Sequence, residues 1–271
     1  MLVVHNEDQN SSSYENLKEI FRPGHADYTY FKKYGIRDYR GGGRSSGRET
    51  LARVAAGAVA KKILSGKNIS ITAYVIKAAG IECKKIDLAE IEMNDMRAPD
   101  NETAELIKEK ILQLKKEHNS AGGIVECVIK GVPAGLGEGV FDKLNADLAK
   151  AMISIPSVKG IEFGIGFACA DLTGKENNDQ ISCDGFLSNN SGGILGGIST
   201  GQDINFRIAV KPTPSISLEQ KTIDINGKET ICNITGRHDP CICPRMVPVV
   251  EAMSAVTLLD HLMINNSMKS N

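Results

Sequence analysis

Four apolar segments with the period of a β-strand alternate with segments that have the period of an α-helix, and this alternation constrains the fold most. The expected strands cover residues 69–78, 123–130, 158–163 and 204–210. The expected helices cover residues 46–64, 103–117, 141–153 and 247–264. Because no linker divides these elements into two groups, we expect a single mixed domain over residues 1–271.

Side-chain spacing also predicts which residues of these elements are buried. The strand at 123–130 places Val125, Cys127 and Ile129 on one face. Three of the expected helices carry apolar residues at helical spacing on one face. These residues are Leu51, Val54, Ala55, Ala58, Val59 and Ile63 in the helix at 46–64, Leu106, Ile107, Ile111 and Leu114 in the helix at 103–117, and Val250, Met253, Val256, Leu259 and Met263 in the helix at 247–264. A short strand is expected at residues 1–5, and Asn226-Gly227 predicts a type I′ hairpin turn.

Composition limits the classes of partner. The 271 residues include 32 basic and 33 acidic side chains, and 5 % of residues are aromatic with no tryptophan. This balance gives no reason to expect nucleic acid or an anionic membrane as a partner. Seven cysteines, an odd number without a secretory signal, favour reduced thiols in the cytoplasm. The Cys241-x-Cys243 pair has no second pair at zinc-site spacing, so we expect no metal.

A triple-glycine turn at residues 41–43 precedes the first long helix and carries cationic and hydroxyl side chains. Glycines allow a ligand to approach the backbone closely, and Arg44 and Arg48 supply two guanidinium groups. Residues 46–49 have the pattern of a capping box, so free N–H groups would face the turn. We interpret this segment as a phosphate site, and the alternative is a flexible glycine loop before an ordinary core helix. It lacks the Gly-Lys-Ser/Thr of a Walker A loop.

Side chains that could take part in catalysis occur in two further loops. His25 lies in a loop at residues 22–27, and Arg237, His238 and Asp239 are adjacent near the last helix. Such a trio can act as phosphate clamp, proton carrier and base. The alternative is a surface Asx turn at Asp239-Pro240 that starts the helix.

A glycine-rich apolar run at residues 192–197 has two open interpretations. Four glycines in so short a run indicate backbone that passes close to a ligand or to another chain. A mobile loop would have the same composition.

In this order, the segments resemble the chorismate synthase family. The family patterns are Arg-Pro-Gly-His-Ala-Asp, Gly-Gly-Gly-Arg-Ser-Ser-x-Arg-Glu-Thr, Ser-Asn-x-x-Gly-Gly-Ile-Leu-Gly-Gly, Lys-Pro-Thr and Gly-Arg-His-Asp-Pro-Cys. All five occur here between residues 22 and 241. The resemblance implies an α+β sandwich with helices packed between antiparallel-rich sheets, assembled as a homotetramer.

The resemblance also implies a reaction. The family converts 5-enolpyruvylshikimate 3-phosphate to chorismate and phosphate by 1,4-anti elimination, the last step of the shikimate pathway. The reaction requires reduced FMN, and NADPH is a possible reductant.

Site residues follow from the motif match. His25 would protonate the reduced flavin or keep it anionic, and Asp239 would be the base, directly or through the flavin. Arg22, Arg48 and Arg237 would bind substrate. The expected cofactor-binding residues are Arg44, Ser45, Ser46, Pro156, Ser157, Gly196, Lys211, Pro212, Thr213, Pro214, Ser215 and Arg237.

The sequence departs from the family pattern at its beginning. A Gly-Glu-Ser-His-Gly motif and several arginines that the family carries in an N-terminal segment are not in this sequence. The resemblance therefore implies a chain that begins partway into the domain and lacks one catalytic histidine. The alternative function is an inactive fragment that retains anion or flavin binding or subunit association.

Overall fold

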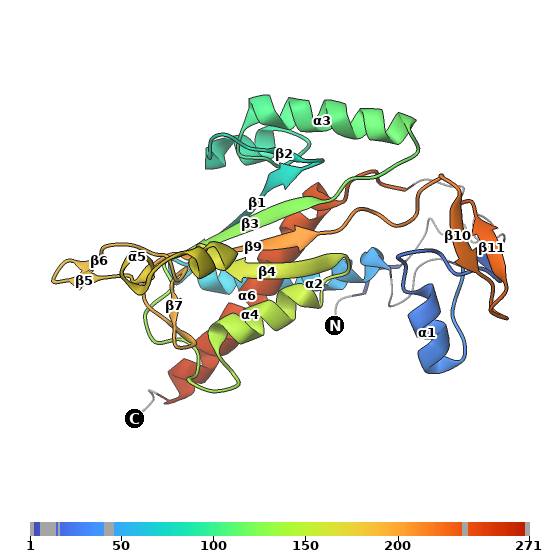
Figure 1. Cartoon of the computed structure of the whole chain (residues 1–271). Coiled ribbons are helices and arrows are strands. Elements are labelled where there is room, and N and C mark those ends of the chain that lie inside the picture. Colours follow the sequence, from blue (N-terminus) through green and yellow to red (C-terminus); the bar gives the residue numbers. More distant parts are fainter. Residues whose placement is uncertain (1–2, 6–14, 16, 41–45, 235–237, 269–271) are drawn as a thin grey trace.

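The computed structural model describes residues 3–5, 15, 17–40, 46–234 and 238–268. Its centre is a five-stranded sheet in the order β2-β1-β3-β9-β4, with every neighbouring pair antiparallel (Figure 1). These strands are β1 (Ser70–Ala78), β2 (Ile81–Glu82), β3 (Gly123–Lys130), β4 (Val158–Phe163) and β9 (Ile204–Val210). The four long expected strands are thus confirmed within one residue.

The described residues also form helices, some of which pack on this sheet and some of which lie beyond its ends. They are α1 (Asp27–Tyr34), α2 (Thr50–Ser65), α3 (Asn101–Lys116), α4 (Leu144–Ile153), α5 (Gly174–Asn177) and α6 (Cys243–Met268). Two-stranded sheets lie outside the main one, formed by β5 (Ile181–Ser182) with β6 (Gly185–Phe186), β7 (Ile194–Leu195) with β8 (Ile198–Ser199), and β10 (Gln220–Ile223) with β11 (Glu229–Cys232). The mixture of helices and antiparallel sheets confirms the α+β class.

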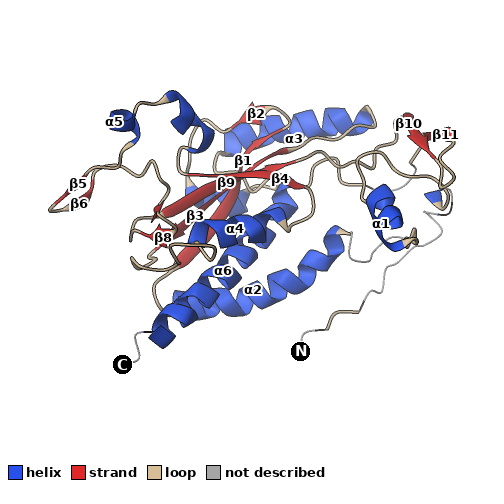
Figure 2. Ribbon diagram, turned by 60° about the horizontal axis from the view of Figure 1, so that its bottom comes forward, coloured by secondary structure: helices blue, strands red, loops and turns tan. Residues whose placement is uncertain are grey.

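Helices α2, α4 and α6 form one layer against the sheet (Figure 2). The strand face toward this layer carries Val125, Cys127 and Ile129, all fully buried as expected from their alternation. Helix α6 is long and apolar enough to cross a membrane. Half of the residues in its most apolar stretch are buried inside the protein, however, and the helix packs against α2, α4 and β1. It is the central helix of the core.

The close crossing of α2 and α6 explains why the buried face of α2 differs from expectation. A side chain at Gly57 would lie 2.3 Å from the Cβ of Ala252, so the helices meet at small residues. Gly57, Ala60 and Leu64 therefore form the buried stripe of α2. The larger apolar residues of the expected stripes that remain substantially exposed are Leu51, Val59, Ile63, Leu106, Val256 and Met263.

Several expected boundaries are also wrong. Helix α2 begins at Thr50, after a 3₁₀ turn at Gly47–Glu49, and not at Ser46. Residues 3–5 form no strand and are exposed. Helix α4 begins at Leu144, because the backbone at Phe141 has a positive φ of 53°, and α6 begins four residues earlier than expected, at Cys243. The expected hairpin between β10 and β11 is present. Its turn is not type I′, because only Gly227 among the turn residues has a positive φ, whereas type I′ needs two such residues. The backbone N–H of Gly227 donates to the carbonyl of Asp224.

Candidate functional site

Several of the motif segments meet at one end of the main sheet. Lys211 follows the last residue of β9, and its backbone N–H donates to the carbonyl of Ser157, which precedes β4, at 3.0 Å. Ser120, just before β3, donates its hydroxyl to the carbonyl of Thr213 at 2.8 Å. Neighbouring antiparallel strands thus bring Pro156-Ser157 and residues 211–215 together.

The loop at residues 22–27 lies against this end. The Lys211 ammonium donates to the carbonyl of Gly24. Gly24 has a φ of 67°, and a Cβ there would lie 3.3 Å from the Cβ of Pro214. Glycine suits this position, because other residues rarely adopt this φ and a Cβ would crowd Pro214.

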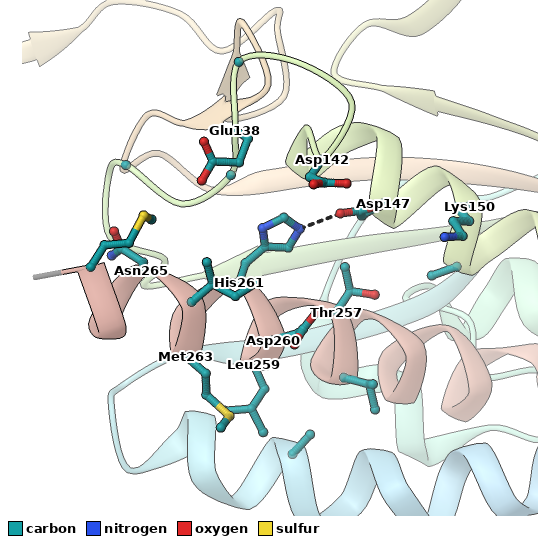
Figure 3. A pocket seen from close by; sticks show the side chains of 18 of the residues that line it. Glu138, Asp142, Asp147, Lys150, Thr257, Leu259, Asp260, His261, Met263 and Asn265 are labelled. Atoms are coloured by element: carbon teal, nitrogen blue, oxygen red, sulfur yellow. Dashed lines mark hydrogen bonds and ion pairs between the residues drawn. The ribbon is translucent and has the colours of Figure 1, made fainter.

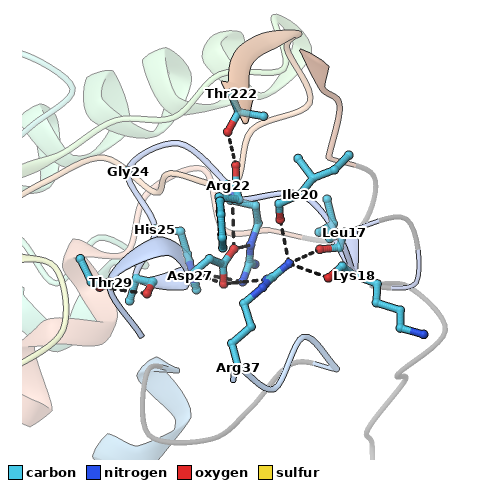
Figure 4. Close-up of polar contacts among 12 residues, drawn as sticks. Leu17, Lys18, Ile20, Arg22, Gly24, His25, Asp27, Thr29, Arg37 and Thr222 are labelled. Atoms are coloured by element: carbon cyan, nitrogen blue, oxygen red, sulfur yellow. Dashed lines mark hydrogen bonds and ion pairs between the residues drawn. The ribbon is translucent and has the colours of Figure 1, made fainter. Parts of the chain in front are cut away.

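Arg22, His25 and Asp27 form a compact polar network (Figure 4). Arg22 donates from Nε and Nη2 to the two carboxylate oxygens of Asp27, at 2.7 and 3.0 Å. The Nδ1 of His25 lies 3.0 Å from Asp27 Oδ1 and 3.1 Å from Arg22 Nη2. These contacts fix the imidazole and leave its Nε2 as the nitrogen that a ligand would meet.

Arg37 completes the network and was not foreseen from the sequence. Its Nη1 lies 3.2 Å from Asp27 Oδ1, and its Nη2 donates to the carbonyls of Leu17, Lys18 and Ile20. The density of charged and aromatic residues around 28–40 is the available signal, but it does not single out Arg37.

The charged groups of the network shift each other's pKa values. Burial alone would raise the pKa of Asp27, but hydrogen bonds and charges from His25 and Arg22 hold that pKa far below its ordinary value. His238 has a lowered pKa, chiefly because it is half-buried and then because Arg22 and His25 are nearby. The loop that contains His25 and the loop that contains His238 are therefore close enough for their charges to interact.

The loop after β11 joins the same end of the sheet. The carbonyl of Pro240 accepts from Ala121 N at 2.7 Å, next to the start of β3. Asp239 forms an ion pair of 2.8 Å with Arg245, so a side chain of α6 orients its carboxylate.

The start of α2 approaches the same end. Arg53 donates to Ser154 Oγ at 2.6 Å, two residues before Pro156. Ser46 caps a 3₁₀ turn at Gly47–Glu49 by accepting from Arg48 N, while Glu49 pairs with Arg53, so the expected capping box does not form. The Arg48 side chain is exposed. Arg44, Ser45 and Arg237 lie outside the described residues.

Gly196 is at the opposite end of the sheet. It lies between β7 and β8, and the backbone of Gly193 packs against Asp203 at the beginning of β9. Lys211 follows the other end of this strand of seven residues, roughly 20 Å away at the usual rise per residue. The fold of one chain therefore separates Gly196 from the other described site residues.

A groove of about 1270 Å³ lies at the Gly196 end, between α2, α4 and α6 (Figure 3). His261 is almost fully buried there and its Nε2 lies 3.0 Å from Asp147. The charged residues that line the groove are Glu138, Asp142, Asp147, Lys150 and Asp260. Because four of these five are carboxylates, the groove disfavours an anionic ligand, and we place the candidate site at the Lys211 end.

The fold and this loop cluster define an α+β protein with a cationic site at one end of an antiparallel sheet. Comparison with known families identifies a particular one: the family described as chorismate synthase matches residues 1–263. A chorismate synthase of Chloroflexus aurantiacus is 52 % identical over 267 residues, which cover 97 % of this chain and 73 % of the relative. One from Methanosarcina mazei is 54 % identical over 274 residues, which cover 97 % and 74 %.

Solved structures agree. A crystal structure of chorismate synthase superposes with a TM-score of 0.73 at 32 % identity, over 89 % of this chain and 70 % of that one. The chain belongs to the chorismate synthase family. The family is one of lyases of aromatic amino acid biosynthesis.

Proposed function

We propose that this chain eliminates phosphate from 5-enolpyruvylshikimate 3-phosphate to give chorismate, with reduced FMN as cofactor. The observation that carries the proposal is the convergence of the segments at 22–27, 156–157, 211–215 and 238–241 at one end of the sheet, in a chain of this family. Lys211, Arg22 and Arg48 bring positive charge to this end, which suits a substrate with a phosphate and two carboxylates.

The residues present fit a flavin phosphate or ring edge. Within the described residues, the hydroxyl of Thr213 is buried without a hydrogen-bond partner, as expected of a group that binds a ligand. Burial and the charge of Lys159 lower the pKa of Lys211, whose ammonium lies beside Gly24. We propose that Ser46, Pro156, Ser157 and residues 211–215, with Arg44, Ser45 and Arg237, hold the cofactor. Reduced FMN, when bound, would lend electron density as phosphate leaves.

The protein's own groups would supply proton handling and orientation. His25, fixed through Nδ1, would present Nε2 to the flavin and control its protonation. Asp239, oriented by Arg245, would accept the proton lost from the substrate ring. Because Nε and Nη2 of Arg22 are directed at Asp27, its contact with substrate would come from Nη1.

The proposal includes an assembly and a location. If Gly196 contacts the cofactor, a second copy must supply it, since one chain holds Gly196 and Lys211 at opposite ends of β9. A homotetramer would satisfy this requirement. Seven cysteines without a disulfide favour the cytoplasm, and NADPH is the proposed reductant.

The test is anaerobic turnover with chemically reduced FMN and 5-enolpyruvylshikimate 3-phosphate. We expect chorismate and phosphate in equal amounts. His25→Asn and Asp239→Asn should each reduce kcat by about 100-fold or more, as is typical when a general acid or base is removed. Asp184→Asn, at an exposed position on the β5–β6 hairpin away from the site, is the matched control. Release of phosphate without chorismate would reject the proposed reaction, and full activity of either site variant would reject its role.

A further inference from the structure

Arg37 is a buried cation to which the proposed reaction gives no task. Its side chain is 6 % exposed, and its Nη2 donates to the carbonyls of Ile20 and Lys18, at 2.8 and 3.1 Å, and to that of Leu17. Its Cζ lies 5.5 Å from the centroid of the Phe21 ring. Arginine is almost never buried so deeply without partners, and here backbone carbonyls hold the guanidinium in place.

The backbone that holds Arg37 is itself fixed. The N–H of Phe21 donates to the carbonyl of Ile223 at 3.2 Å, and the carbonyl of Phe21 accepts from the hydroxyl of Thr222. Because Thr222 and Ile223 belong to β10, the segment at residues 17–21 is attached to the β10–β11 hairpin. The fold, rather than a ligand, therefore sets the position of the Arg37 guanidinium.

We propose that Arg37 is a positioning residue for the proposed reaction. Through Asp27, it holds the His25 ring in the tautomer that carries its proton on Nδ1 and leaves the lone pair on Nε2. The proposal rests on the function argued above, in which Nε2 of His25 meets the flavin. It adds Arg37 and Asp27 as residues that act through His25 and contact neither cofactor nor substrate.

Asp27 connects Arg37 to His25 (Figure 4). Its Oδ1 lies 3.2 Å from Arg37 Nη1 and 3.0 Å from His25 Nδ1. Within the part of the chain that the structure describes, Arg37 Nη1 has no hydrogen-bond partner, so it acts on Oδ1 through its charge. Arg22 also binds both carboxylate oxygens, but its Nη1 is the group proposed to contact substrate. Arg37 is thus the cation that keeps Oδ1 beside the ring when Arg22 engages a ligand.

The contacts of Nδ1 select the tautomer of a neutral His25 ring. Nδ1 lies 3.0 Å from Asp27 Oδ1 and 3.1 Å from Arg22 Nη2. If the proton were on Nε2, the Nδ1 lone pair would face a carboxylate oxygen, and two acceptors in contact repel. With the proton on Nδ1, the ring donates a charge-assisted hydrogen bond to Oδ1. Arg22 Nη2 already donates to this oxygen at 3.0 Å, so it does not need Nδ1 as an acceptor.

This tautomer suits the proton handling that the proposed reaction requires. In a neutral ring with the proton on Nδ1, Nε2 of His25 is an acceptor that can take a proton from a bound group and later return it. A neutral ring with its proton on Nε2 could only donate there. Without Arg37, the carboxylate of Asp27 loses one of the two cations that hold it, and the ring loses its fixed acceptor.

The tautomer can be measured on the unsubstituted chain without any turnover. Proton–nitrogen correlation spectra of the full chain, with isotopically labelled histidine nitrogens, would be recorded at about pH 8.5, where histidine rings are ordinarily neutral. We expect the Nδ1–H tautomer for His25, assigned by its loss in His25→Asn. His261, whose Nε2 lies 3.0 Å from Asp147, should show the opposite tautomer. An Nε2–H tautomer at His25 would overturn the proposal whether or not the chain makes chorismate.

The same spectra test the part assigned to Arg37. In Arg37→Met the signals of His25 should move toward a mixture of both tautomers. Arg37→Lys keeps a charge but cannot bond the three carbonyls and reach Asp27 together, so we expect an intermediate result, and this variant serves if Arg37→Met does not fold. An unchanged tautomer in a folded variant would show that Arg37 does not position the ring.

Kinetics separate positioning from a merely structural role. Arg37→Met should lower kcat by about tenfold or more with KM unchanged, because an ångström-scale misplacement of a reacting group can cost about 100-fold. Added to His25→Asn, it should cause no further loss, since both changes act on one group. Arg97→Met, which removes a cation from an exposed ion pair with Glu92, is the control and should change neither constant. Equal losses with and without His25 would contradict the proposal.

Discussion

At the scale of the residue, Asp27 is the side chain on which the polar network depends. It is 5 % exposed and contacts the guanidinium groups of Arg22 and Arg37 and the ring of His25. Without its charge, two largely buried cations would face each other unpaired. A buried charge without a counter-ion lowers the stability of the fold strongly. In an intact ion pair, the attraction between the two charges roughly offsets the free-energy cost of removing them from water.

Asp27→Asn should therefore destabilise the fold by about 3–5 kcal/mol. Urea unfolding at pH 7 measures the effect. Asp184→Asn, an exposed carboxylate on the β5–β6 hairpin, is the control and should leave the midpoint unchanged. Equal midpoints for both variants would show that the network does not contribute to stability.

The pH dependence follows from the lowered pKa of Asp27. Because the folded pKa lies below the unfolded value of 3.8, the stabilisation is fully present above that pH and is lost as pH falls from it toward the folded pKa. The stability difference between the parent chain and Asp27→Asn should shrink below about pH 4. Unfolding free energies of both chains from pH 7 to pH 3 measure it, and a constant difference would contradict the assignment.

Single residues were predictable from sequence only where a motif marked them. His25, Lys211 and Asp239 belong to recognisable segments, and their segments meet in the structure. Arg37 also belongs to the network, but its hydrogen bonds go to the carbonyls of Leu17, Lys18 and Ile20, which are distant in sequence. No local pattern encodes such a contact.

At the scale of the element, the contact between α2 and α6 depends on Gly57. A Cβ there would meet both Cβ and Cα of Ala252, at 2.3 and 2.4 Å, so the helices would have to move apart. Gly66, at the C-terminal end of α2, has a φ of −65° and its nearest neighbour would be 3.4 Å from a Cβ.

Gly57→Ala should lower stability by about 1–3 kcal/mol, as overpacking does in tight cores. Gly66→Ala is the matched control and should be neutral or slightly stabilising, because alanine restricts the unfolded chain more than glycine. Thermal unfolding of both variants measures the difference. A Gly57→Ala chain as stable as Gly66→Ala would mean that the crossing is not tight.

Strands were easier to predict than helix faces for a physical reason. A strand with one buried face has a period of two, and the ends of β3, β4 and β9 were predicted correctly. In α2 the contact surface consists of small residues, so the large apolar side chains that dominate the pattern lie elsewhere. Hydrophobic periodicity finds a helix but misplaces its buried face when the helices cross closely.

At the scale of the whole molecule, Gly196 and Lys211 lie at opposite ends of β9, so a cofactor site that used both residues would need two copies of the chain. Gly196 has a φ of 61° and open space around its Cβ position, so Gly196→Asn should fold, since asparagine tolerates this conformation. If Gly196 serves the site of another copy, this variant and Lys211→Ala should each be impaired alone.

Mixing the two impaired chains tests this arrangement. In random equal mixtures, about a quarter of the sites would combine an intact Lys211 with an intact Gly196 from another copy, so activity should return toward that fraction. Turnover of the mixed assembly, compared with each variant alone, measures it. Activity no higher than the mean of the separate variants would show that Gly196 does not reach a partner's site.

The central claim is that the end of the sheet around Lys211 holds the cofactor, and FMN binding in the presence of 5-enolpyruvylshikimate 3-phosphate tests it most directly. Flavin fluorescence titrations would compare the parent chain with Lys211→Ala and with Lys175→Ala, a lysine on α5. The account predicts that Lys211→Ala weakens binding by about tenfold or more, as expected for loss of a hydrogen bond to a charged group, while Lys175→Ala binds as the parent does. Equal affinity of all three chains, or no FMN binding by the parent, would contradict it.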